Sequence, residues 1–147
     1  MDARLTYRAV AAQGASPLRL VILLYEQAIE DLRQALAALA QGDIEGRTQK
    51  IKHAVLVIGH LQASLDMAQG GEVAANLERF YQETRAGLLN AQIRQSAAGI
   101  QKQLSSLMRV RQAWQEVERQ SAPPIQQPEP TSRQFDSERP SFADWKA

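Results

Sequence analysis

Histidines are the first residues of this sequence to test for chemistry, because imidazole binds metals and transfers protons near neutral pH. The chain has two, His53 and His60, which are seven residues apart and therefore two turns apart on one helix face. This separation is too long for both to bind one metal ion easily, and the i, i+4 spacing of helical zinc sites is absent. We expect both histidines to lie on the surface or in a groove, and we predict no metal site.

Carboxylates, a serine and a glycine pair give no stronger catalytic pattern. Glu30 and Asp31 are adjacent, so they point apart on a helix, and we expect both on a solvated face. Ser64 and Asp66 have no spacing to the histidines that supports a catalytic triad. The glycine pair at 70–71 is no phosphate loop, because no strand precedes it and no lysine follows it. None of these residues supports catalysis or a cofactor; a bundle enzyme or metal protein stays a rival interpretation, which the sparse histidines argue against.

The elements that position these residues are helical, because apolar residues recur at helical spacing over most of the 147-residue chain. Helices are expected from Pro17 to about residue 41, and over about 44–67, 72–92 and 97–119. Four amphipathic helices with short connections pack as an antiparallel bundle. We predict an all-α fold, with an antiparallel four-helix bundle over residues 16–120.

Helix boundaries follow from capping residues. N-caps are expected at Ser16, Asp43 and Ser96, because their side chains can accept a hydrogen bond from the first helical turn. Gly70 is expected to take the left-handed conformation that ends the second helix, and Gly71 then lets the chain reverse. The second and third helices therefore form a hairpin at this pair.

Apolar stripes run along all four helices and begin at Ile44 in the second helix and at Val73 in the third. The first two helices carry further apolar residues beside their stripes: Leu20, Leu23, Leu24, Ala54, Val57 and Leu61. A helix that is apolar on more than one side has more than one neighbour. The surplus is either the core of a tight bundle or a groove for an amphipathic partner helix, and composition leaves both open.

Composition argues against several classes of partner. The net charge of +1 and the dispersed basic residues provide no stripe for nucleic acid or anionic membrane. The apolar runs are too short to cross a bilayer, and the first residues lack the apolar region of a secretory signal. The chain has no cysteine, so it has no disulfide framework. We expect a cytoplasmic protein without nucleic-acid binding or membrane insertion.

The two ends of the chain differ from the bundle. Residues 1–15 are either a frayed terminus or a mobile segment that docks on the body through Tyr7 and Val10. Residues 121–147 are rich in proline and lack helical periodicity, so we predict a disordered tail. Near its end, Phe142 and Trp145 are either part of an unstructured terminus or a short docking motif for this body or another protein.

A series of short motifs lies around the predicted hairpin. It consists of Ser64-Leu65-Asp66, Gly70-Gly71-Glu72, Asn76-Leu77 and Tyr81. In this order and spacing, the motifs resemble the flagellar export chaperones of the FliS type, and the resemblance covers about residues 7 to 117. It implies a cytosolic chaperone that binds the disordered C-terminal segment of flagellin. Such a chaperone prevents premature polymerisation and presents the subunit to the flagellar type III export gate.

The resemblance and the surplus apolar positions together indicate a partner-binding surface. Tyr7 and Val10 are expected to cover a groove when the client is absent and to move when it binds. The remaining candidates are the groove wall, at Leu24, Tyr25, Val57 and Leu61, and the hairpin region, at Leu65, Asn76, Leu77, Phe80 and Tyr81. In the hairpin region, the apolar positions also suit a role in the core. The alternative is a homodimeric structural or regulatory bundle without a flagellin client, in which the same apolar faces pair.

Overall fold

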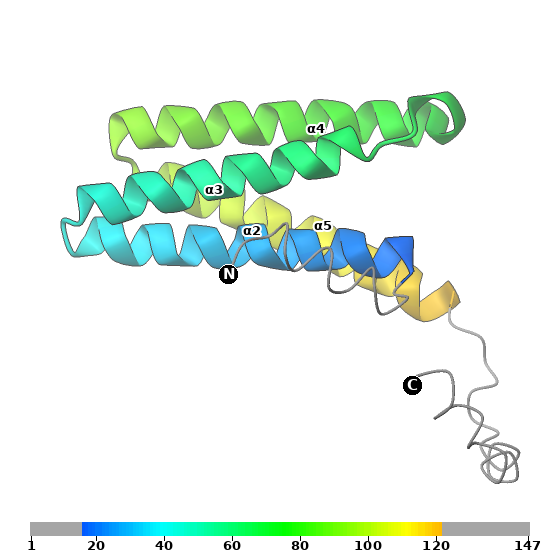
Figure 1. The fold of residues 1–147 in the computed structure, drawn as a ribbon, viewed down its shortest axis with the longest axis horizontal. Coiled ribbons are helices and arrows are strands. Elements are labelled where there is room, and N and C mark those ends of the chain that lie inside the picture. Colours follow the sequence, from blue (N-terminus) through cyan, green and yellow to red (C-terminus); the bar gives the residue numbers. More distant parts are fainter. Residues whose placement is uncertain (1–15, 122–147) are drawn as a thin grey trace, which may run out of the picture.

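The computed structural model describes residues 16–121, which form four α-helices (Figure 1). Their bounds are α2 Pro17–Ala40, α3 Ile44–Ala63, α4 Met67–Arg94 and α5 Ala97–Ser121. Successive helices run in opposite directions, and both α2 and α4 pack against α3 and α5. The predicted all-α antiparallel four-helix bundle is confirmed. The predictions for the N-terminal segment and for the tail after α5 lie outside the described residues.

Each helix begins at a side chain that accepts a hydrogen bond from the backbone N–H three residues later. The four capping residues are Ser16, Asp43, Asp66 and Ser96, with donor–acceptor distances of 2.9 to 3.1 Å. Such caps satisfy backbone donors that have no partner within the helix. The predicted caps of α2, α3 and α5 are confirmed, whereas the sequence pattern places Asp66 inside the second helix.

The connection between α3 and α4 differs from the prediction. Asp66 caps a single helical turn that begins at Met67, and Gly71 then takes a non-helical conformation (φ 56°, ψ −135°) that redirects α4. Gly71, rather than Gly70, is therefore the residue that needs the conformational freedom of glycine. The predicted bounds of the second and third helices are wrong here, because the local cap ends the second helix earlier than the apolar pattern suggests.

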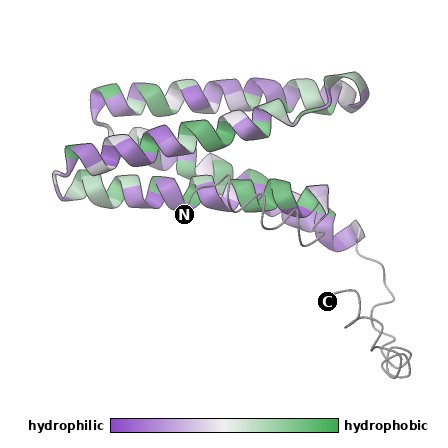
Figure 2. Ribbon diagram, in the orientation of Figure 1, coloured by the Kyte–Doolittle hydropathy of each residue, from purple (hydrophilic) through white to green (hydrophobic). Residues whose placement is uncertain are grey.

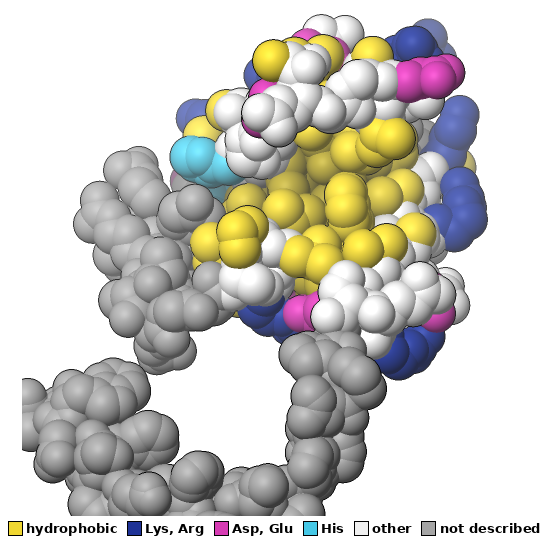
Figure 3. Space-filling view, turned by 90° about the vertical axis from the view of Figure 1, so that its right-hand side faces the viewer, with side chains coloured by type: hydrophobic (Ala, Val, Ile, Leu, Met, Phe, Trp, Pro, Cys, Tyr) yellow, Lys and Arg dark blue, Asp and Glu magenta, His cyan; other side chains and the backbone are white. Residues whose placement is uncertain are grey.

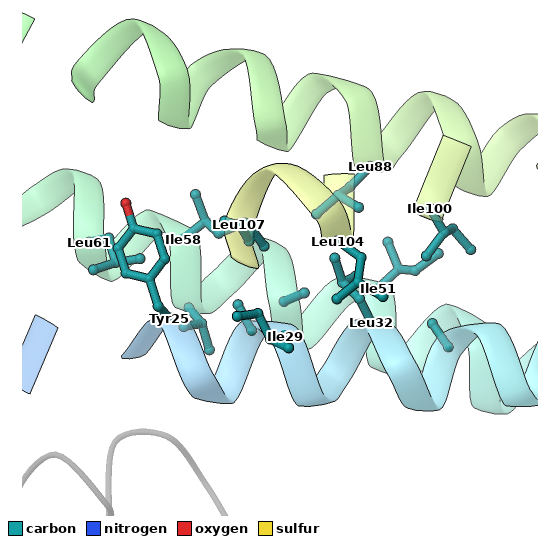
Figure 4. Close-up of a cluster of buried hydrophobic side chains, with 14 of the residues drawn as sticks. Tyr25, Ile29, Leu32, Ile51, Ile58, Leu61, Leu88, Ile100, Leu104 and Leu107 are labelled. Atoms are coloured by element: carbon teal, nitrogen blue, oxygen red, sulfur yellow. The ribbon is translucent and has the colours of Figure 1, made fainter. Parts of the chain in front are cut away.

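Polar and apolar residues alternate along each helix, as Figure 2 shows, and the apolar sides meet in one core. Figure 4 shows side chains from all four helices pointing into it: Tyr25, Ile29, Leu32, Ile51, Ile58, Leu61, Leu88, Ile100, Leu104 and Leu107. Two expected stripe residues lie outside the core, since Ile44 and Val73 are 62% and 64% exposed. Ile44 is the first residue of α3, and Val73 lies just after the break at Gly71, so neither faces the opposite helices.

Polar side chains fix α3 against α4 near the end where α3 begins. Arg47 is buried, and its Nε donates to Oε1 of Gln92 at 3.0 Å. The amide nitrogen of Gln92 in turn donates to Oγ1 of Thr48 at 2.6 Å. A buried guanidinium needs such partners, because an unpaired buried charge is strongly destabilising. The network therefore sets the register of the two helices.

Candidate functional site

The end of the bundle at which α2 and α4 begin and α3 and α5 end is apolar and accessible. Partly exposed side chains pack against the core there: Val21, Leu65, Leu77, Phe80 and Trp114. The space-filling view onto this end shows a broad hydrophobic surface between the helix ends (Figure 3). We call these five residues the open end. Exposed apolar surface of this kind marks a site of interaction with another molecule.

Two tyrosines lie buried beneath the open end. The Tyr25 hydroxyl donates a hydrogen bond to the Tyr81 hydroxyl at 2.8 Å, and the ring centroids are 6.2 Å apart. Phe80 extends this aromatic group, because its ring centroid lies 5.7 Å from that of Tyr81. Burial raises the pKa of both tyrosine hydroxyls, so both remain neutral. The pair therefore forms a rigid base for the open end.

Polar contacts hold the two sides of the open end. On one side, the Arg19 guanidinium donates twice to the Glu118 carboxylate, at 2.7 and 3.0 Å, and joins α2 to α5. The hydrogen bond to Arg19 lowers the pKa of Glu118. On the other side, Gln62 donates to Glu78 at 3.1 Å and joins α3 to α4. Because both pairs are partly exposed, they contribute more to geometry than to stability.

α5 also brings a buried hydrogen-bond donor to this region. The Arg111 Nε–H has no hydrogen-bond partner within residues 16–121, whereas the Trp114 indole lies within reach of the Tyr25 hydroxyl. Buried donors usually have acceptors, and a buried donor that makes no hydrogen bond destabilises the fold. The backbone carbonyls of a bound polypeptide are suitable acceptors. The site therefore combines apolar surface with a donor, on Arg111, that a peptide could satisfy.

The structure separates the residues predicted for the site into three groups. Leu65, Leu77 and Phe80 meet at the open end, and Asn76 is exposed beside them on α4. The second group is almost completely buried: Leu24, Tyr25, Val57, Leu61 and Tyr81. Tyr7 and Val10 form the third group and lie outside the described residues.

The expectation that Leu24, Tyr25, Val57 and Leu61 form an accessible groove wall is corrected by their burial, which leaves at most 7% of each residue exposed. The physical reason is that α3 packs against both α2 and α4, so both of its apolar sides find neighbours within the chain. Of the surplus apolar residues, Leu24, Ala54, Val57 and Leu61 are thus the core of a tight bundle, whereas Leu20 and Leu23 remain partly exposed. Val21 and Trp114, which the sequence analysis did not propose for the site, are only partly buried and belong to the open end.

The prediction of a solvated Asp31 is wrong, since only 1% of this residue is exposed. Its carboxylate lies 2.6 Å from Nδ1 of His53 and accepts a hydrogen bond from the Gln27 side chain at 3.1 Å. Burial raises the pKa of Asp31, while the His53 contact opposes this shift. His53 is therefore a structural partner between α3 and α2, whereas His60 is exposed as predicted.

Metal-binding and membrane-spanning features were the remaining possibilities for the described part of the chain. Among residues 16–121, no group of three histidine, cysteine or acidic side chains is arranged to hold a metal ion. None of α2 to α5 combines the length and the apolar character needed to cross a membrane.

The described residues define the class of all-helical bundles with an apolar surface at one end, and such a surface suits the binding of a polypeptide. Comparison with known proteins makes the class specific. The family described as "Flagellar protein FliS" matches residues 1–121, and the chain belongs to this family. The resemblance found in the sequence is thereby confirmed.

Curated relatives of the chain carry the name flagellar secretion chaperone. The FliS protein of Salmonella typhimurium is 32% identical over 108 residues, which cover 73% of this chain and 80% of the relative. The FliSB protein of Pseudomonas aeruginosa is 31% identical over 118 residues, covering 78% and 94%. The FliS protein of Vibrio cholerae is 28% identical over 104 residues, covering 71% and 76%.

Proposed function

We propose that this chain is a cytoplasmic export chaperone that binds the disordered C-terminal segment of flagellin at the open end. Binding would prevent premature polymerisation of the subunit and allow its delivery to the flagellar type III export apparatus. Family membership supports the chaperone role. One observation carries the choice of site: Leu65, Leu77 and Phe80 meet at the apolar open end. Leu65 and Leu77 belong to the family motifs, and Phe80 directly precedes the motif residue Tyr81.

The physics of a disordered client favours such a surface. A disordered segment loses conformational entropy when it binds, so apolar burial must offset that loss. An amphipathic helix of the client could lay its apolar face between α4 and α5, against Leu77, Phe80 and Trp114. The Arg111 guanidinium could then donate hydrogen bonds to client carbonyls. No catalytic group is needed for this role.

The N-terminal segment has a place in the same proposal. Tyr7 and Val10, which lie outside the described residues, would cover the open end when no client is bound and move when it binds. A chaperone with such a cover would avoid presenting apolar surface to the cytoplasm. Removing both side chains by alanine substitution should strengthen client binding, because the client would no longer compete with the segment.

Calorimetric titration of the full chain with a peptide from the C-terminal segment of flagellin tests the proposal. We expect saturable one-to-one binding with a negative heat-capacity change, which reports apolar burial coupled to folding. Leu77→Asp should abolish the binding heat, and Ile93→Asp is the matched control. Ile93 lies on the same helix but is 79% exposed and far along α4 from the open end. Circular dichroism must show that both variants remain helical.

The alternative is a homodimer in which the same apolar surface of two chains pairs. Light scattering on the free protein distinguishes this alternative from the chaperone proposal. A stable dimer that persists after addition of the flagellin peptide, together with no binding heat, would contradict the chaperone proposal. In that case Leu77→Asp should dissociate the dimer. A monomer that gains the mass of one peptide supports the proposed function.

A further inference from the structure

A second apolar surface lies along α3 and α4, apart from the residues of the open end. A groove of about 480 Å³ is lined there by Lys52, Val55, Leu56, Gly59, His60 and Arg85. Leu56 is 50% exposed, and a Cβ atom added to Gly59 would meet no atom within 4 Å. Gly59 therefore leaves a notch in the apolar wall. We call this surface the α3–α4 groove. Its volume lies in the range of pockets that bind small organic ligands.

The α3–α4 groove also favours negative charge. Its lining includes Lys52, Arg85 and His60 and no carboxylate. Nη1 of Arg85 donates to Oε1 of Gln62 at 2.9 Å, but the buried Nε–H of Arg85 has no acceptor within residues 16–121. A carboxylate bound in the groove would interact with the partly exposed guanidinium of Arg85, and hydrogen bonds between guanidinium and carboxylate are among the strongest in proteins.

The sequence after α5 contains a segment with the complementary chemistry. Residues 135–145 include three aromatic residues, three carboxylates and one arginine within eleven positions. Aromatic side chains suit the apolar wall, and carboxylates suit Lys52 and Arg85. The family match ends at residue 121, so this segment lies outside the region that defines the family.

The segment can reach the groove from the end of α5. Phe135 follows Ser121 by 14 residues, which can span up to about 45 Å when extended. α5 ends at the same end of the bundle as α3. Gly59 lies about one turn before the last residue of α3, and neighbouring helix axes are about 10 Å apart. The connecting chain is therefore long enough.

We propose that residues 135–145 dock in the α3–α4 groove of their own chain. The aromatic side chains contact Val55, Leu56 and the notch at Gly59, and the carboxylates bind Lys52 and Arg85. Because the segment is tethered, its effective concentration at the groove is high even if the contacts are weak. The docked segment shields the exposed Leu56 and competes with any other polypeptide that uses this face.

Trp145 provides the readout. The chain has two tryptophans, so the full-length protein with Trp114→Phe reports only on Trp145. We expect its fluorescence to be blue-shifted and its quenching by acrylamide to be several-fold weaker than in a free peptide of residues 135–145. The protection should weaken as salt is added, because the exposed charges of the groove are screened.

Gly59→Leu, introduced into the Trp114→Phe protein, tests whether the segment docks in the α3–α4 groove. The Cβ atom of the new side chain meets no atom within 4 Å, the rest of the side chain occupies the notch, and leucine favours a helix more than glycine does, so we expect the fold to be retained. Quenching of Trp145 should rise to the value of the free peptide, and Lys52→Glu should raise it as well. The matched control is Ala37→Leu, an exposed small-to-large change on α2, which should leave the protection intact.

Three outcomes overturn the proposal. Trp145 could be as accessible in the full chain as in the free peptide, or Gly59→Leu could leave its protection unchanged. Protection that increases with protein concentration would mean that the segment binds a second copy instead. Because no flagellin is present, each of these results is independent of the test of the proposed chaperone function.

Discussion

The Tyr25 hydroxyl donates a 2.8 Å hydrogen bond to the Tyr81 hydroxyl and joins α2 to α4 across the diagonal of the bundle. Both residues are at most 1% exposed. Neither hydroxyl can reach bulk water, so loss of their mutual hydrogen bond leaves a buried hydroxyl short of a partner. The pair links the core to the open end, because the Phe80 ring packs beside Tyr81.

Replacing either tyrosine by phenylalanine should destabilise the chain by about 1 to 3 kcal/mol, because the remaining hydroxyl is left buried without its partner. The double variant Tyr25→Phe/Tyr81→Phe should cost clearly less than the sum of the single changes. Urea unfolding of the four proteins measures this coupling free energy. Additive effects would mean that the two hydroxyls do not depend on each other.

The sequence predicts the fold well where the signals are local. Caps at Ser16, Asp43 and Ser96 need only a side chain and a backbone N–H three residues away, and all three are confirmed. The connection before α4 is mispredicted because two local signals compete there. Asp66 can start a helix and the glycine pair can end one, and the sequence alone does not rank them.

Burial depends on packing between helices, and the sequence is less informative about it. The apolar pattern identifies Leu61 and Val57 as surplus, but only the position of α3 between two neighbours shows that both are core. Asp31 looks like a solvated residue because its partner, His53, lies on another helix. Of the candidate site, the sequence finds Leu65, Leu77 and Phe80 through or beside the family motifs, but their meeting with Val21 and Trp114 follows from the bundle geometry.

Asp31→Asn should change how stability depends on pH. Burial raises the folded-state pKa of Asp31 above its ordinary value of 3.8, so the folded chain holds this proton more tightly than the unfolded chain. The contribution of this carboxyl to stability therefore falls as pH rises from 3.8 through the folded-state pKa. Asparagine does not ionise, so Asp31→Asn removes this fall in stability with rising pH. Its side-chain oxygen still offers an acceptor to His53.

Urea unfolding from about pH 3.5 to about pH 7 checks this prediction. The stability of Asp31→Asn relative to the unmodified chain should rise with pH, by about 1.4 kcal/mol for each unit of pKa difference. Glu30→Gln, on the neighbouring exposed position of α2, is the control and should show no such trend. A falling trend for Asp31→Asn would show that the contact with His53 outweighs burial.

Gly71→Ala should destabilise the chain by about 1 to 3 kcal/mol, because the backbone at φ 56° and ψ −135° is strained for any residue with a Cβ. Gly59→Ala is the matched comparison within α3. The added methyl meets no atom within 4 Å, and alanine favours a helix, so we expect a gain of about 0.5 to 1 kcal/mol. Thermal unfolding followed by circular dichroism measures both; equal effects of the two changes would argue against the break at Gly71.

Leu61 lies in the core and Phe80 lies at the open end, so substitutions at these two residues should have different effects. Leu61 is 1% exposed, so Leu61→Asp buries a charge without a partner and should abolish the helical fold, since the penalty exceeds typical domain stability. Phe80 is only partly buried at the surface. Phe80→Ala should leave the chain folded and weaken flagellin-peptide binding by about 1 to 3 kcal/mol, the range of important interface residues.

Circular dichroism and calorimetric titration of the two variants decide this assignment. If Leu61→Asp stayed helical and only lost peptide binding, Leu61 would belong to an accessible groove and the client would have to open the bundle to reach it. If Phe80→Ala bound the peptide as tightly as the unmodified chain, the client would bind elsewhere than the open end. Helical Phe80→Ala with weakened binding, beside unfolded Leu61→Asp, is the result that the burial of the two side chains predicts.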